Sequence, residues 1–149
     1  MKNLENESVK RRNIQSIRKG DIASLQRTIS EYDILRMAEI SGDYNPIHLD
    51  DEYAKTTSFK KVIAHGLFCA AMISALLGNE LPGLGTILVS ENIQYLRPVF
   101  VGDTITASVL VDDIDYETRK ITLSFLCENQ KKYPVVKGTA ETLLCEENS

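Results

Sequence analysis

The sequence predicts an α+β domain in which one antiparallel sheet curls around a single buried helix. Two observations lead to this prediction. Residues 67–77 are apolar almost all round, and a helix that is apolar on every face must be buried on every face. Strand-like segments then follow one another with short connections, which favours antiparallel pairing; they cover residues 86–96, 104–111, 121–127 and 135–144.

Composition narrows the function classes. The chain has 149 residues, with 43% hydrophobic and 26% charged residues, as in one ordinary globular domain. No apolar run approaches the roughly 20 residues of a membrane span, so no membrane partner is expected. The net charge of -4 disfavours nucleic acid as a general partner. No apolar segment typical of a signal peptide follows the first charges, so we expect a cytoplasmic protein.

Few side chains could ligate a metal or form a disulfide framework. There are three cysteines, an odd number, and no C-x-x-C pair. There are also only two histidines, which makes a multi-histidine metal site improbable on composition alone. We therefore expect neither a metal nor a cofactor.

The first elements can be placed in order along the chain. Residues 1–19 are basic and polar, and we expect a partly disordered lead-in before a domain at 20–149. Residues 25–29 alternate like a strand. Ser30 and Asp33 resemble a capping box, which predicts a helix that Gly42 ends. A polar loop at 43–48 and a short helix with acidic residues in its first turn should follow.

The later elements complete the predicted architecture. The apolar helix should begin near Gly66 and end at Gly78. Residues 116–119 and 129–132 have the composition of hairpin connections. Strand, helix, loop, buried helix and four strands together predict the hot-dog fold, a sheet wrapped around one central helix.

The loop after the first helix is the strongest candidate site. Asp43 and His48 are five residues apart across a turn set by Asn45-Pro46, so both side chains could face one pocket. A carboxylate and an imidazole that share one water form an acid–base pair suited to neutral pH. Spacing alone also allows a plain turn, since Asp and Asn before proline are common in turns.

The dipeptide His65-Gly66 is the second candidate. A helix N-terminus offers unpaired N–H groups and the positive end of the dipole, which would stabilise an oxyanion. Glycine lets a ligand approach that backbone closely. For His65 itself, a structural role as a partly buried cap is the favoured interpretation at this point.

Four blocks of this sequence resemble the MaoC-like dehydratase family. Residues 41–48, Ser-Gly-Asp-Tyr-Asn-Pro-Ile-His, are similar to the family's hydratase-2 signature. The other blocks follow in the family's order and spacing, and the resemblance extends from about residue 15 to residue 145; they are His65-Gly66-Leu67, residues 81–87 and residues 96–103. The spacing is that of short, stand-alone (R)-specific enoyl-CoA hydratases.

This resemblance implies a homodimer that hydrates trans-2-enoyl-CoA to (R)-3-hydroxyacyl-CoA, reversibly and without a cofactor. Asp43 and His48 would activate the water, with Asp43 relaying the proton. The backbone N–H of Gly66 would hold the thioester oxygen. Asn45 would hold the loop or the pair, and Ser74 matches a family serine that faces the site, although a helix hydroxyl can equally bond its own backbone.

Three alternatives remain at this level. The chain could be a 3-hydroxyacyl-carrier-protein dehydratase, since the sequence does not separate a CoA thioester from a carrier-protein thioester. It could be a hot-dog thioesterase, although those enzymes usually lack the Asp and His of this loop. It could also be a non-catalytic acyl-thioester-binding subunit, which the retained pair argues against. Acyl-chain length and the physiological direction stay open.

Overall fold

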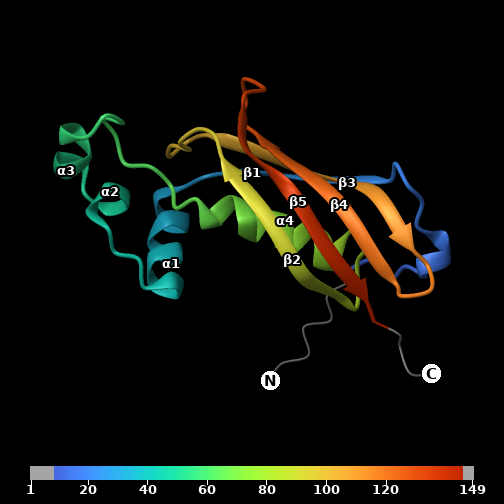
Figure 1. Ribbon diagram of the computed structural model, residues 1–149. Coiled ribbons are helices and arrows are strands. Elements are labelled where there is room, and N and C mark those ends of the chain that lie inside the picture. The colour runs from blue at the N-terminus through green and yellow to red at the C-terminus, as the bar shows by residue number, and fades with distance from the viewer. Residues whose placement is uncertain (1–8, 146–149) are drawn as a thin grey trace.

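The computed structural model describes residues 9–145 and contains one five-stranded antiparallel sheet with a helix on its concave side (Figure 1). The helix is α4 (Leu67–Asn79), as the apolar segment predicts. The strands are β1 (Ile22–Thr28), β2 (Thr86–Tyr95), β3 (Thr104–Asp115), β4 (Lys120–Glu128) and β5 (Pro134–Leu144). The predicted sheet around a central helix is therefore confirmed.

The strand order differs from a simple meander. The order is β1-β3-β4-β5-β2, and every neighbouring pair is antiparallel. β3, β4 and β5 do follow one another, as expected, but β2 pairs with β5 rather than with β3. This leaves β1 and β2 as the two edge strands, whose outer backbone groups lack a strand partner within the sheet.

The core lies between the sheet and α4. Alternate residues of β3 and β4 point at the helix and are buried, which is the period-two pattern seen in the sequence. The helix contributes the face that carries Cys69, Ile73 and Leu76. The strand residues of this layer are Ile105, Ala107, Val109, Val111, Ile121, Leu123, Phe125 and Cys127.

Helix α4 departs from the prediction in two ways. It runs through Gly78 to Asn79, so the expected stop at Gly78 is wrong. The left-handed backbone that turns the chain lies instead at Gly83, whose φ is 98° and whose N–H donates to the carbonyl of Leu77. In addition, one stripe of the helix is exposed in the single chain, at Leu67, Ala71 and Ser74.

The region before β1 belongs to the packed domain. Ile14, in a short 3-10 turn (η1, Ile14–Ser16), is 2% exposed, and Ile17 is fully buried. Both join the core cluster, so the packed region begins earlier than the expected boundary at residue 20. The part of the expected lead-in that covers residues 1–8 lies outside the described residues.

The remaining helices extend beyond one end of the sheet, next to the start of α4 (Figure 1). They are α1 (Glu31–Ser41), α2 (Pro46–Leu49) and α3 (Asp51–Thr56). The capping box is confirmed, because Ser30 and Asp33 each accept from the other's backbone N–H. Gly42 ends α1 in the left-handed conformation, with φ 74°. None of the helices within residues 9–145 is long and apolar enough to cross a bilayer.

Candidate active site

The segment between α1 and α2 is a chain of short side-chain-to-backbone bonds. The Ser41 hydroxyl accepts from the N–H of Asp43 (3.2 Å), and Asp43 Oδ1 accepts from the N–H of Asn45 (3.1 Å). Asn45 then caps α2, because its Oδ1 accepts from the N–H of Ile47 (3.3 Å). Pro46 begins that helix, a position where its missing N–H costs nothing. The expected loop is thus partly helical, and α2 carries His48.

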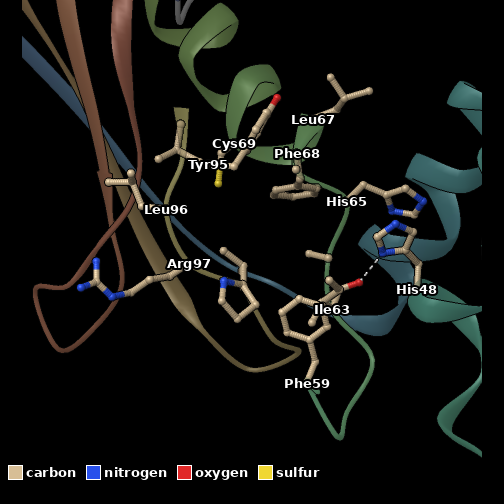
Figure 2. A pocket seen from close by; sticks show the side chains of 15 residues that line it. His48, Phe59, Ile63, His65, Leu67, Phe68, Cys69, Tyr95, Leu96 and Arg97 are labelled. Atoms are coloured by element: carbon tan, nitrogen blue, oxygen red, sulfur yellow. Dashed lines mark hydrogen bonds between the residues drawn. The ribbon is translucent and has the colours of Figure 1, made fainter. Parts of the chain in front are cut away.

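His48 faces Asp43 with a defined ring nitrogen. His48 Nδ1 lies 2.7 Å from the carbonyl oxygen of Ile63, as the dashed line in Figure 2 marks. A carbonyl oxygen only accepts, so Nδ1 carries the hydrogen, and in the neutral ring Nε2 carries the lone pair. Nε2 lies 3.8 Å from Asp43 Oδ2. The imidazole is 11% exposed and the carboxylate 49% exposed, so the pair sits at the edge of solvent.

A second imidazole packs on the first. The rings of His48 and His65 are stacked, with centroids 3.9 Å apart and planes 26° from parallel. Figure 2 shows both rings at one end of the cavity. His65 Nε2 lies 2.9 Å from the backbone carbonyl oxygen of Asp43, so it carries the hydrogen and donates. His65 is only 3% exposed.

These residues border an apolar cavity of about 620 Å³. His48 and His65 lie at one end of it, and Arg97 lies at the other (Figure 2). Gly66 also lines the cavity. The remaining side chains come from the chain before α4, from the first turn of α4, from the end of β2 and the segment after it, and from β5; they are Phe59, Ile63, Ala64, Leu67, Phe68, Cys69, Tyr95, Leu96, Pro98, Val99 and Val136. The size and lining suit a small apolar ligand with a polar end.

The N-terminus of α4 opens toward this cavity. Gly66 is its N-cap residue, and no side chain caps this helix end within the described chain. A Cβ at Gly66 would lie 2.7 Å from Cε1 of Tyr95, so only glycine fits without moving that ring. Burial, reinforced by the nearby Glu91 carboxylate, raises the pKa of the Tyr95 hydroxyl, which stays protonated at neutral pH.

The structure brings together three of the five residues expected from the sequence. His48 and Gly66 both line the cavity, and Asp43, which does not line it, faces His48 across 3.8 Å. Asn45 holds the loop through its cap on α2, and it does not line the cavity. Ser74 lies on the exposed stripe of α4, two turns beyond Gly66, and it does not line the cavity of the single chain either.

Asp43, His48 and His65 each offer one potential metal-ligating atom, all within 4.8 Å of one another. Imidazole nitrogens bind metals along lone pairs that lie in the ring plane. The two rings are stacked and nearly parallel, so their lone pairs do not converge on one point. The two imidazoles are therefore not oriented as converging ligands of one metal ion.

Sequence reasoning missed two features of this site. His65 was interpreted as a cap, and its contacts with Asp43 and His48 depend on a fold that joins segments 22 and 17 residues apart. Tyr95 was not singled out, because a tyrosine at the end of a predicted strand is ordinary. The sequence feature that could have indicated Tyr95 is Gly66, which lies next to it in space. A glycine at the start of a helix indicates that another group approaches the backbone closely there.

Fold and site together define the class: a hot-dog domain with a facing carboxylate and imidazole beside a cavity that the start of the central helix lines. The family described as MaoC like domain matches residues 13–125, so this chain belongs to that family. It is 42% identical over 130 residues to the (R)-specific enoyl-CoA hydratase of Rhodospirillum rubrum, covering 87% of this chain and 90% of the relative.

A second hydratase supports the same placement. The chain is 41% identical over 126 residues to the (R)-specific enoyl-CoA hydratase of Aeromonas caviae, covering 85% of this chain and 94% of the relative. A solved structure titled as the (R)-hydratase from A. caviae involved in PHA biosynthesis superposes with a TM-score of 0.85 at 36% identity. That match covers 88% of this chain and 99% of the solved one, and it confirms the predicted hot-dog fold.

Proposed function

We propose that this protein is a hydro-lyase that adds water to trans-2-enoyl-CoA to give (R)-3-hydroxyacyl-CoA, and that it catalyses the reverse dehydration. One observation carries the proposal. His48 lies at the end of an apolar cavity that the uncapped N-terminus of α4 also lines, and it faces Asp43 across 3.8 Å. The relatives named as (R)-specific enoyl-CoA hydratases support the choice of reaction.

The pair is suited to hold one water molecule. A distance of 3.8 Å is too long for a direct hydrogen bond, but both Asp43 Oδ2 and His48 Nε2 are acceptors. One water can therefore donate a hydrogen to each of them, which leaves an oxygen lone pair for attack. As that oxygen bonds to C3 of the enoyl group, one water proton passes to the pair.

In the second half of the reaction, the Asp43–His48 pair gives a proton to C2 of the product. The C2–C3 double bond opens as the water oxygen bonds to C3, and C2 then takes one proton from the pair. Asp43 relays this proton, and His48 orients the water and shares the acid–base work. Neither side chain is consumed, and no electrons are exchanged with an external group.

The start of α4 would stabilise the charge that develops on the thioester oxygen. The backbone N–H of Gly66 is the proposed donor, supported by the positive end of the helix dipole. Asn45 keeps the loop in place through its cap on α2. Ser74 is proposed to join the site only from the assembled dimer, since the single chain leaves it exposed.

We further propose that the active form is a homodimer built on β2. This edge strand carries an exposed apolar stretch at Ile87 (50% exposed), Leu88 (40%) and Val89 (54%). Its last residue, Tyr95, and the next residue, Leu96, line the cavity, so the proposed interface is continuous with the site. A second copy paired along β2 would cover this edge, which an unpaired chain leaves open to aggregation.

Loss of enoyl-thioester absorbance with crotonyl-CoA, followed by chiral analysis of the product, tests this function. We expect turnover to the (R)-3-hydroxyacyl product and no release of free thiol. Free thiol would indicate a thioesterase. Turnover of the carrier-protein thioester but not of the CoA thioester would indicate a carrier-protein dehydratase. Binding of either thioester without turnover would indicate a non-catalytic subunit. The cytoplasmic location stays a prediction.

A further inference from the structure

We propose that His65 is a positioning residue that holds Asp43 and His48 in the relative geometry needed to bind and activate water. The inference deepens the proposed hydration and rests on it. It assigns a role to a buried side chain that the mechanism above does not use. The argument depends on two contacts of the His65 imidazole and on one of its nitrogens that has no partner.

The first contact holds the main chain of Asp43. His65 Nε2–H donates to the Asp43 carbonyl oxygen over 2.9 Å. Asp43 itself lies in an exposed turn, and its carboxylate is 49% exposed. The two other hydrogen bonds of Asp43, its N–H to the Ser41 hydroxyl and the Asn45 N–H to its carboxylate, are local and exposed. The bond from His65 is therefore the long-range contact that ties the turn to the body of the domain.

The second contact holds the ring of His48. The face of His65 stacks on His48 at a centroid distance of 3.9 Å. One edge of His48 is bonded to the Ile63 carbonyl, which limits rotation of the ring. The stack limits its tilt, so the direction of the Nε2 lone pair toward Asp43 is set by two groups. One imidazole thus contacts both members of the pair.

The third observation separates this role from simple packing. Within residues 9–145, His65 Nδ1 is one of two buried side-chain nitrogen or oxygen atoms without a hydrogen-bond partner. A buried polar atom without a partner is unfavourable, and an apolar side chain would fill the same space without that penalty. Packing alone therefore disfavours histidine here, whereas a flat ring with one donor at Nε2 satisfies both contacts.

The position of His65 in the sequence connects it to the proposed oxyanion donor as well. Gly66, which offers the proposed oxyanion donor, follows His65 directly. The backbone of this dipeptide starts α4, and the His65 carbonyl accepts from the N–H of Phe68 in the first turn. The carboxylate, the imidazole and the N–H donor are thus held relative to one another through one dipeptide.

Three substitutions separate the ring from its donor. His65→Phe keeps a flat ring and removes the donor. His65→Gln places an amide N–H near the position of Nε2, whereas His65→Asn carries the same amide one carbon short of the Asp43 carbonyl. We expect kcat to fall about 10- to 100-fold in His65→Phe and His65→Asn, with KM within about threefold, because small misplacement of reacting groups is costly. His65→Gln should stay within about fivefold of wild type by the same reasoning.

Two further measurements complete the test. The thermal midpoint of each variant shows whether a loss of activity merely follows a loss of folded protein, and NMR of the ring nitrogens shows which nitrogen carries the hydrogen. The chain has two histidines, so ring-nitrogen NMR gives two spin systems, and His65→Phe assigns the remaining one. In the neutral-ring spectrum we expect hydrogen on Nε2 of His65 and on Nδ1 of His48.

Four outcomes would overturn the role of His65. These are hydrogen on Nδ1 of His65, equal kcat in the Gln and Asn variants, activity losses that merely follow the loss of folded protein, and wild-type kcat in His65→Phe. A wild-type chain without hydratase turnover would overturn the proposed function instead. The ring spectrum would then decide by itself whether the His65 bridge exists.

Discussion

His48 Nε2 and Asp43 Oδ2 stand 3.8 Å apart, and neither atom has a hydrogen to offer the other when the ring is neutral. This relationship predicts that both residues act through a shared water. Asp43→Asn and His48→Gln should each lower kcat by about 10²- to 10⁴-fold, the range for loss of general acid–base catalysis. Steady-state kinetics with crotonyl-CoA measures this. Because the two residues act as a unit, the double variant should lose little more than either single one, and additive losses would contradict a shared water.

Gly66→Ala should inactivate by displacing a neighbouring ring. The added Cβ would lie 2.7 Å from Tyr95 Cε1, so the ring must move, and the cavity that it lines must change shape. We expect kcat/KM to fall at least roughly tenfold, since displacement of substrate by about 1 Å can cost more than that. Tyr95→Leu should relieve the collision. A double variant no more active than Gly66→Ala would show that the clash is not the cause.

Phe68 separates two cavities, and its size should influence acyl-chain preference. It lines the cavity of about 620 Å³ at the site and a second one of about 280 Å³ between β1, α1 and α4. Phe68→Leu should raise kcat/KM for an eight-carbon enoyl-CoA relative to crotonyl-CoA by roughly threefold or more, because each buried methylene contributes about 0.8 kcal/mol. Phe59→Leu is the matched control, as Phe59 borders only the first of these cavities. An equal change in both variants would contradict the separating role.

Asp33 should make folding stability sensitive to acid. Burial alone would raise the pKa of this carboxyl, but hydrogen bonds from Ser30 and Arg27, with the Arg27 charge, outweigh it and hold the pKa below the ordinary value of 3.8. Stabilisation from a depressed pKa is complete above the unfolded-state value and is lost as the pH falls through the folded-state value. The melting temperature of wild type should therefore drop more steeply below about pH 4 than that of Asp33→Asn. Parallel curves for the two proteins would disprove this.

Val89→Lys should weaken the proposed dimer. Val89 is 54% exposed on edge strand β2, and in a two-fold pairing each substitution enters the interface twice. Analytical ultracentrifugation should show a larger dimer dissociation constant together with lower activity. Ile22→Lys adds the same charge to the other edge strand, at a residue that is 67% exposed, and should leave the dimer intact. A fully active monomer would refute the need for dimerisation.

The fold was predictable where its determinants are local. Alternation in β3 and β4, and the uniformly apolar stretch of α4, depend on residues close in sequence. The pairing of β2 with β5 was not predictable, since the connections after α4 and after β2 carry no information on register. Ile14 and Ile17 were missed because two isolated apolar residues among charges give no periodic signal.

The sequence predicted which residues form part of the candidate site, but not which of their atoms face each other. The spacing across Asn45-Pro46 allowed Asp43 and His48 to face one pocket, and the family resemblance favoured this over a plain turn; the structure places the two side chains 3.8 Å apart. Which nitrogen of His48 faces the carboxylate depends on the Ile63 carbonyl, 15 residues away. The contacts of His65 are longer in range still, and only the folded chain reveals them.

The link between His65 and the Asp43 turn has a consequence for protein engineering. A peptide or a foreign scaffold that carries only residues 41–48 would contain the proposed acid–base pair but would lack the contacts of His65 with it. Transplanting the activity would require the start of α4, with His65-Gly66, to be grafted at the same time and in the same spatial relation. The smallest part of the chain that could be transferred with its geometry is thus a pair of segments, residues 41–48 and the start of α4, and the second of these resembles an ordinary helix N-terminus.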